Sequence, residues 1–194
     1  MKRKAKKRYF KRSFQESIDY LKESRKSIYF IIGVFFISAL ITFVLPSYFT
    51  FFDEIIGEIF LKTSHLDGLE LTIYIFINNF TAALVSLLLG LFLGIFPVIN
   101  AVTNGGLLGY VSARVVDTVG ILTLWRLLPH GIFEIPAILI AMGLGVKLGM
   151  TFFSGNIKKN FSYRLDRSIK ALVFVILPLL LIAAIIEGIL ISFL

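Results

Sequence analysis

The chain has 194 residues, 57% of them hydrophobic, and a mean hydropathy of +0.88. Its apolar runs are longer than the core of a soluble protein of this size needs, which is typical of a membrane protein. The absence of cysteine excludes disulfides, thiolate catalysis and cysteine-bound metal. We therefore expect an all-α, multi-pass helical membrane protein with one membrane domain at residues 27–194 and about five transmembrane helices.

The formal net charge of +8 comes from residues 1–26, which hold eleven Lys and Arg against three Asp and Glu, whereas the remainder holds nine of each. The positive-inside rule places this basic arm in the cytoplasm. Each basic side chain near the surface contributes about 1 kcal/mol of attraction to anionic headgroups, so membrane lipid is the expected partner. Nucleic acid is not expected, because the arm has few aromatic residues and no recognised binding motif. A cleaved signal peptide is not expected either, since the charged region is far too long.

The first predicted span is the apolar run 28–45, which Pro46 stops. The outer segment 47–70 follows it and carries five acidic residues against Lys62, which suits the external side. Within this segment, apolar residues recur at helical spacing with acidic residues between them. That pattern predicts an amphipathic helix on the outer surface.

The second predicted span covers 71–96 and ends before Pro97, and the third covers 98–116. The third span is interrupted by Asn100, Thr103, Asn104 and several glycines. Its glycines permit either a tightly packed helix or a broken, re-entrant one, because irregular backbone at membrane depth must be buried in protein or face water. Of the two, we favour a full crossing.

The fourth predicted span covers 131–150 and the fifth covers 170–194, in which Pro178 predicts a kink. Between them, the segment 151–168 holds four Lys and Arg against Asp166, so the positive-inside rule makes it a cytoplasmic loop. This order of spans places the N-terminus in the cytoplasm and the C-terminus outside.

Small residues recur four apart on three of the spans. Such stripes let helix backbones approach closely, because lipid offers no hydrophobic drive for association and packing has to supply it. They predict a tight bundle with the second and fourth spans at its centre, or packing against another protomer in a homo-oligomer or membrane complex. The stripes are Ala82, Ser86, Gly90 and Gly94 on the second span, Gly105, Gly109 and Ala113 on the third, and Ala137, Ala141, Gly145 and Gly149 on the fourth.

A histidine and a carboxylate stand at the start of the fourth span, in Pro129-His130-Gly131-Ile132-Phe133-Glu134-Ile135-Pro136. At 100° per residue, both fall on the small-residue stripe of that span, and Asn79 falls on the stripe of the second. Because Pro136 has no backbone N–H to donate, the helix either kinks there or begins near Ile135.

Under the predicted topology, six polar residues lie in the outer half of the bilayer or at its outer edge: His130, Glu134, Asn79, Asn78, Arg114 and Glu187. An intramembrane carboxylate needs a cation or a donor, so we expect Arg114 near Glu134 or Glu187. The cluster is either a polar knot that fixes helix register or a site for a substrate, an ion or a proton. A metal site is not expected, because one histidine and one carboxylate lack a third ligand in the sequence.

Known catalytic motifs are missing from the sequence. It has no His-Glu-x-x-His zinc motif, no Gly-x-Ser-x-Gly elbow and no phosphate-binding Gly-x-x-x-x-Gly-Lys. The element Asn104-Gly105-Gly106 has no nucleophile with an adjacent base. We therefore expect neither an enzyme nor a bound cofactor.

Three elements resemble the integral membrane family that includes stage II sporulation protein M: Gly94-Ile95-Phe96-Pro97, Asn104-Gly105-Gly106-Leu107-Leu108-Gly109, and the segment from Pro129 to Ala137. The resemblance is strongest over residues 71–149. It implies a multi-pass protein related to one that helps recruit a peptidoglycan-degrading machine during engulfment, with relatives in archaea and non-sporulating bacteria. We accordingly expect a scaffold or assembly component of a cell-envelope membrane complex. The alternative is a transporter or channel component that uses the outer polar cluster.

Overall fold

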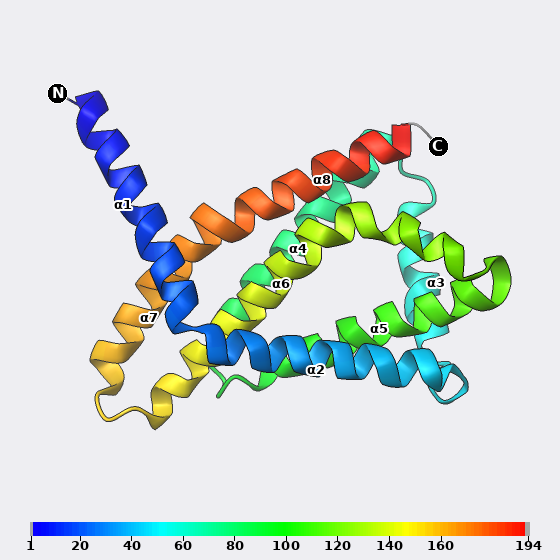
Figure 1. Ribbon diagram of the computed structural model, residues 1–194, viewed down its shortest axis with the longest axis horizontal. Helices are drawn as coiled ribbons and strands as arrows, with labels where there is room; N and C mark the ends of the chain where they lie inside the picture. Colours follow the sequence, from blue (N-terminus) through cyan, green and yellow to red (C-terminus); the bar gives the residue numbers. More distant parts are fainter. Residues whose placement is uncertain (1, 193–194) are drawn as a thin grey trace.

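The computed structural model describes the backbone of residues 2–192 and the side chains of residues 8–124 and 131–189. Every regular element in that part of the chain is a helix (Figure 1), which confirms the all-α class. The α-helices are α1 (Lys2–Glu23), α2 (Arg25–Val44), α3 (Phe52–Thr63), α4 (Gly68–Leu89), α5 (Ile95–Val119), α6 (Leu128–Gly149), α7 (Ile157–Ala171) and α8 (Leu177–Ser192). Shorter helical segments are Pro46–Tyr48, Ile121–Leu127, Met150–Phe153 and the π-helical Leu172–Ile176.

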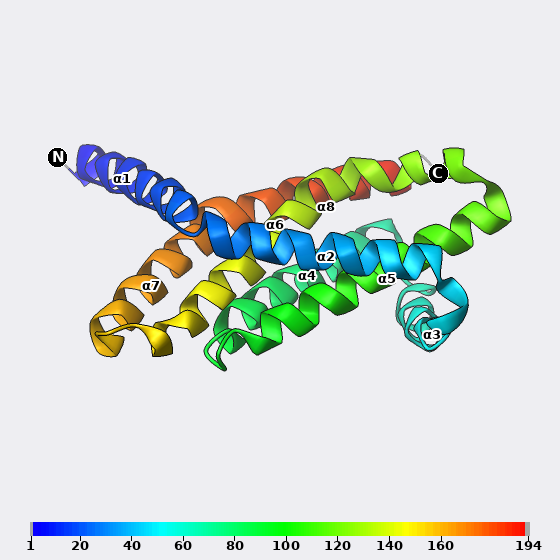
Figure 2. The ribbon, with the colours of Figure 1, turned by 60° about the horizontal axis from the view of Figure 1, so that its bottom comes forward.

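The helices form an elongated bundle in which α6 touches α2, α4, α5 and α8. α2 and α5 run side by side along one edge, and α8 packs with α4 and α6 along the other (Figures 1 and 2). α1 packs against α7 at one end of the bundle, which we call the basic end, while α3 lies at the opposite end, the α3 end. The two charged segments of the sequence, 1–26 and 47–70, are thus at opposite ends.

Among the described residues, four helical segments are long and apolar enough to cross a membrane: Arg25–Val44, Gly68–Leu89, Gly131–Phe153 and Ile157–Ile189. This is the architecture of a multi-pass helical membrane protein. α5 is less apolar and is not among the four, but its 25 residues span about 37 Å at 1.5 Å per residue. Because α5 continues unbroken past its glycines, a re-entrant third span is not what the structure forms.

The junction between the second and third predicted spans differs from the prediction. α4 ends at Leu89 rather than at 96, and α5 begins at Ile95, so that Pro97 lies in its first turn. A proline is well tolerated there, because backbone N–H groups in the first turn have no intrahelical partner. The chain reverses at Gly94, whose φ of 75° is in the left-handed region that glycine favours.

The predicted loop at 151–168 is also mostly helical. α7 occupies Ile157–Ala171 and continues through the π-helical segment Leu172–Ile176 into α8. Pro178 stands two residues after this segment, and because proline cannot donate to the carbonyl one turn earlier, a regular α-helical ladder is not possible there. The π-segment therefore lies where the proline disturbs the helix. Together, α7, the π-segment and α8 form one continuous rod of 36 residues, 157–192.

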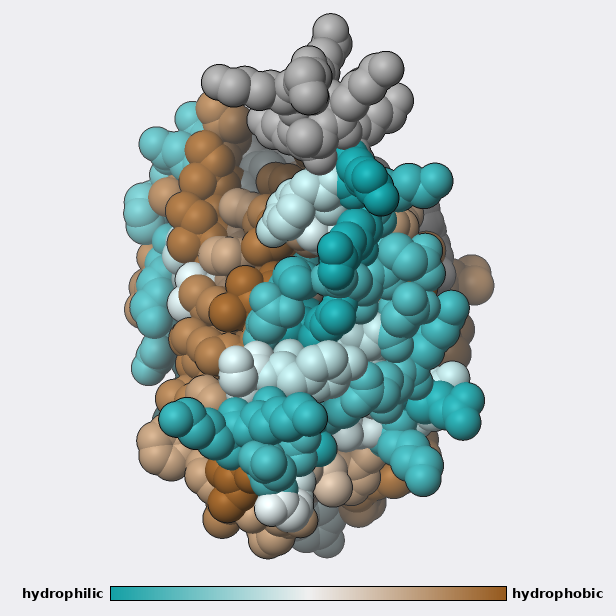
Figure 3. Space-filling model, turned by 90° about the vertical axis from the view of Figure 1, so that its left-hand side faces the viewer, coloured by the Kyte–Doolittle hydropathy of each residue, from teal (hydrophilic) through white to brown (hydrophobic). Residues whose placement is uncertain are grey.

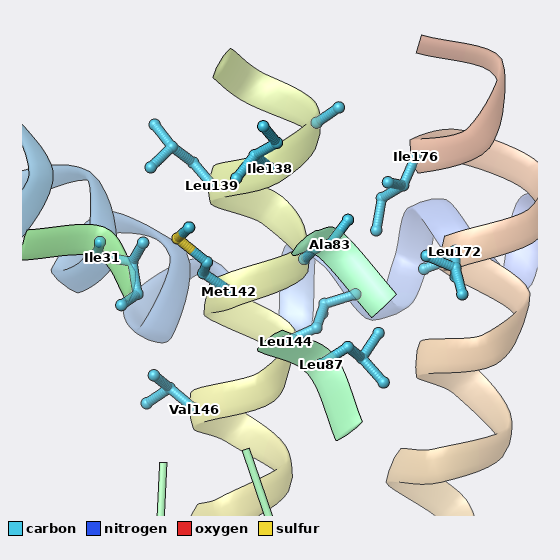
Figure 4. Close-up of a cluster of buried hydrophobic side chains, with 14 of the residues drawn as sticks. Ile31, Ala83, Leu87, Ile138, Leu139, Met142, Leu144, Val146, Leu172 and Ile176 are labelled. Atoms are coloured by element: carbon cyan, nitrogen blue, oxygen red, sulfur yellow. The ribbon is translucent and has the colours of Figure 1, made fainter. Parts of the chain in front are cut away.

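α6 is the hub of the bundle. Of its most apolar stretch, 72% is buried, against 17% for α2. Figure 4 shows α6 side chains reaching toward two neighbours, with Met142 near Ile31 of α2, and Leu144 near Ala83 and Leu87 of α4. Every residue of α6 from Ala141 to Gly149 is buried. A helix covered on all sides has to accommodate neighbours at very short range, which its small residues permit.

Glycines bring the α4 and α6 backbones together. A Cβ added at Gly90 would overlap the Gly145 backbone, and one added at Gly149 would overlap the backbones of Gly90 and Gly94. Ala137 and Ala141 of the same α6 stripe are fully buried, whereas Ala82 is only half-buried on α4, next to the fully buried Ala83. Close approach of this kind maximises dispersion contacts, which hold helices together in lipid.

The glycines of α5 contact α2 in the same way. A Cβ added at Gly105 would overlap the Phe35 carbonyl oxygen, and one at Gly109 would overlap that of Ala39. Two hydroxyls of α2 add hydrogen bonds, since Ser38 Oγ donates to the Val102 carbonyl (2.7 Å) and Thr42 Oγ1 donates to that of Gly106 (2.8 Å). α2 and α5 therefore form a tightly bound pair.

Substitution of one α6 glycine tests the importance of this contact. We expect Gly145→Ala to lower the free energy of unfolding by about 1–3 kcal/mol, because the new methyl meets the Ser86 carbonyl and the Pro97 ring. Gly33→Ala in α2 is the matched control, since nothing lies within 4 Å of its Cβ position. Thermal unfolding in detergent, followed by circular dichroism, should show a lower midpoint for Gly145→Ala only. Equal midpoints for the two variants would contradict the backbone contact.

Candidate functional site: the polar cluster around Glu134

Side chains from four helices line a cavity of about 500 Å³ at the α3 end. Glu134 of α6, Asn79 of α4 and Glu187 of α8 face it, and α3 closes it from the side with Glu58 and Lys62. Of the described residues that line it, three are acidic and one is basic, so this part of the cavity is electronegative. Negative potential of this kind attracts a small cation rather than an anion.

Glu134 is the central residue of the cluster. Asn79 is placed to hydrogen-bond its carboxylate, and Glu187 is near enough to act on it electrostatically. Glu134 also lines a second cavity, of about 240 Å³, on the other side of α6 between α2 and α5. Asn104 of α5 faces this second cavity, whose other lining residues are almost all apolar. Glu134 thus stands between a polar cavity and an apolar one.

Arg114 does not join the carboxylates with which it was expected to pair. Its Nη2 lies 3.0 Å from Asp53 Oδ2 on α3, and its Nε and Nη2 both donate to the Tyr110 hydroxyl. The reason is geometric: Phe52 of α3 is buried against the Tyr110 ring, which brings Asp53 over α5. Arg114 and Asp53 are each about half exposed, so solvent screens the pair and its contribution to holding α3 against α5 is modest.

The remaining predicted site residues, Asn78 and His130, are not placed at the centre of the cluster by the described side chains. Asn78 also lines the larger cavity but is exposed. The side chain of His130 lies outside the described residues. Among the side chains that are described, no three His, Asp or Glu residues converge as metal ligands. α6 begins at Leu128 and continues without interruption through Pro136. The fourth span therefore does not begin near Ile135, which is one of the two possibilities that the sequence leaves open.

A second charged cluster, at the basic end, was not predicted. Glu16 of α1 accepts from three cations: Arg12 (3.0 Å), Arg167 (2.7 Å) and Lys170 (3.0 Å). Hydrogen bonds from Lys170 and Arg12 hold the pKa of Glu16 below its ordinary value. These contacts join the basic arm to α7, so the arm is a docked helix. Figure 3 shows hydrophilic residues gathered on this end of the molecule.

Glu23 at the end of α1 completes this cluster. It accepts a hydrogen bond from Lys147 of α6 (2.8 Å) and another from the Tyr163 hydroxyl of α7 (2.9 Å). Burial alone would raise the pKa of Glu23, but the hydrogen bonds from Lys147 and Tyr163 outweigh it and lower the pKa. Lys147 lies over the Tyr20 ring, 4.6 Å from its centroid. One carboxylate therefore ties three helices together.

A spacing pattern in the basic arm carries the signal for this docking. Ser13, Ser17, Tyr20 and Ser24 recur three or four apart, and all four are at most 2% exposed. Tyr20 of this stripe packs edge-on against the Tyr163 ring of α7, with 6.0 Å between the ring centroids. Because Lys and Arg dominate this segment, so narrow a stripe of buried residues is difficult to recognise in the sequence.

Comparison with known proteins adds two findings. The family described as Stage II sporulation protein M matches residues 27–190. An uncharacterised protein of Methanocaldococcus jannaschii is 30% identical over 181 residues, which covers 85% of this chain and 81% of that protein. No solved structure matches. The region that the family matches includes both cavities and Glu134, whereas all of α1 precedes it.

Acid should release α1 from α7. Because the pKa of Glu16 is lowered in the folded protein, its ion pairs contribute stability that is fully present above 4.5 and lost as the pH falls through the lowered value. The distribution of distances between spin labels at Lys11→Cys and Ser162→Cys should therefore broaden between about pH 5 and pH 3. Glu16→Gln should broaden it already at neutral pH. Asp19→Asn is the control, because the contacts of Asp19, with Lys22 and Gln15, are exposed and lie within α1. A distance unchanged by acid and by Glu16→Gln would refute this account of the docking.

Proposed function

The chain belongs to the stage II sporulation protein M family, and from this premise we propose that it is a non-enzymatic scaffold or assembly component of a cell-envelope membrane complex. The observation that supports this role is the backbone contact of α4 with α6 through Gly90, Gly145 and Gly149. A bundle fixed in this way keeps its surface helices in constant positions. Constant positions are what a scaffold needs in order to hold partners in register.

We also propose an orientation. The basic end carries α1 and α7, whose Lys and Arg far outnumber their acidic residues, and the α3 end carries the acidic segment 47–70. By the positive-inside rule the basic end is cytoplasmic, which puts the N-terminus inside and the C-terminus outside. Exposed basic side chains of α1, such as Arg12 and Lys22, then lie at the level of anionic lipid headgroups.

Partner contact is best supported at α3. This helix buries Phe52 but leaves Phe60 and Leu61 exposed, by 66% and 73%, and Phe51 directly before it is 54% exposed. Since α3 is amphipathic and only 12 residues long, it does not cross the membrane. Its exposed apolar side chains are therefore available to a second copy of the chain or to another membrane protein at this level.

Cysteine labelling tests the orientation on a background without native cysteine. Ser64→Cys, just after α3, should react with a membrane-impermeant maleimide added outside intact cells. Ser162→Cys, on α7, should react only after the membrane is opened, because it faces the cytoplasm. Both serines are exposed, so access to the side chain does not bias the result. The reverse labelling pattern would end this topology.

The scaffold role predicts that a defined α3 surface holds a complex. Leu61→Ser should weaken association by about tenfold or more, since burial of a leucine contributes about 1.5–3 kcal/mol. Leu69→Ser is the matched control, because Leu69 is 71% exposed at the start of α4. The measurement is the amount of complex on native gels after extraction in mild detergent. A wild-type chain that migrates as a lone protomer would refute the scaffold, and equal loss in both variants would refute the α3 surface.

A second role, in transport, is favoured by one observation. Glu134 lines both an electronegative cavity and an apolar one, on two sides of the most buried helix. Ionisable residues within membrane helices are costly and are used for substrate or ion pathways. A purely structural residue at this position would need no cavity on either side.

A further inference from the structure

A chain of hydrogen-bonded side chains runs between α5 and α4, toward the basic end from Glu134. Asn104 Nδ2 donates to the Asn100 side-chain oxygen and to the Asn100 carbonyl (2.9 Å). Asn100 Nδ2 in turn donates to Ser86 Oγ. Both amides are half-buried, and removing an amide from water is unfavourable unless it is hydrogen-bonded, as both are here. The series Asn104, Asn100, Ser86 is a continuous polar path through an otherwise hydrophobic interface.

Cavities lie at both ends of this path. Asn104 faces the 240 Å³ cavity that Glu134 also lines. At the other end, Asn100, Ser86 and Thr103 line a cavity of about 230 Å³ between α4 and α5. α5 begins at the basic end, and Asn100 and Asn104 follow its start by one to three turns. From the α3 end to the basic end, cavities and polar groups therefore alternate.

We propose that this series is a route for a small monovalent cation, H⁺ or Na⁺, with Glu134 as the binding group at its α3 end. The inference rests on the transport role and specifies its substrate class. Carboxylate and amide oxygens are the ligands that hard cations prefer. A divalent ion needs more carboxylate ligands than converge at any point among the described side chains, whereas a monovalent ion needs fewer.

The charged and titratable groups around Glu134 suit a cation. Those facing the larger cavity are Glu58 and Lys62 of α3, Tyr74 of α4 and Glu187 of α8. Lys62 lies 3.5 Å from Glu58, which offsets its charge. On the side of α2 and α5, the described lining contributes only the neutral amide of Asn104. The net field at Glu134 is thus negative on one side and nearly neutral on the other.

The apolar cavity is the controlling segment of the route. Its 240 Å³ has room for several water molecules, but its walls offer few polar partners to hold them. Apolar constrictions of this sort pass ions only while they are hydrated. Passage therefore depends on transient filling of the space between Glu134 and Asn104. The lining side chains are Phe35, Leu107, Leu108, Val111, Ile135, Ile138 and Leu139.

Flux into liposomes tests the route. The full chain, reconstituted in phosphatidylcholine and phosphatidylglycerol vesicles, should dissipate a pH gradient or a Na⁺ gradient about tenfold faster than protein-free vesicles. Glu134→Gln should return flux to the protein-free level, and Asn104→Leu should lower it severalfold. Asp117→Asn, an exposed position near the end of α5, should leave it unchanged. Flux in only one gradient identifies H⁺ or Na⁺ as the ion.

A further variant keeps the test valid if Glu134→Gln does not fold, as judged by its elution volume and helical signal. Val111→Phe fills the apolar cavity while the carboxylate remains, and it should lower flux severalfold. Wild-type flux in Val111→Phe and Asn104→Leu would overturn the route but leave a transport role. Wild-type vesicles that dissipate no H⁺, Na⁺ or K⁺ gradient would overturn both, and flux of K⁺ alone would contradict the assigned cation.

Discussion

The approach of the α4 and α6 backbones at Gly90, Gly145 and Gly149 is the constraint on which the rest of the structure depends. In lipid, side-chain burial between helices gives little net drive, so association needs atoms to meet at short range over a long contact. Once α4 and α6 are fixed, α6 presents its remaining faces to α2, α5 and α8. The positions of Glu134 and of both its cavities follow from that one contact.

Much of the fold could be predicted from the sequence, because hydropathy and glycine spacing are local signals. The all-α class, an amphipathic helix within 47–70 and a central fourth helix are of this kind. The α4–α5 junction could not, since Pro97 can end one helix or stand in the first turn of the next, and only the reversal at Gly94 decides. The helical state of α7 is obscured by its charge, and its stability depends on α1, which is distant in the sequence.

The polar residues show where prediction from periodicity stops. Helical spacing puts Glu134 and Asn79 on facing stripes, and they are brought together in the bundle. Arg114 carries the positive charge that would complement Glu134. It pairs with Asp53 instead, because Phe52 anchors α3 over Tyr110. That choice depends on a buried aromatic contact, which charge and spacing do not encode. The Asn104–Asn100–Ser86 chain likewise joins two helices whose relative rotation is a tertiary property.

The rod formed by α7, the π-segment and α8 has a mechanical consequence. Arg167 and Lys170, which bind Glu16 of α1, stand on the same continuous helical element as Glu187, which faces the Glu134 cavity. About 25 Å of helix separates Lys170 from Glu187. The π-segment and Pro178 lie between them, and helices bend most readily at such features. The docking of α1 at one end and the carboxylate at the other are thus joined through the most easily bent part of the element.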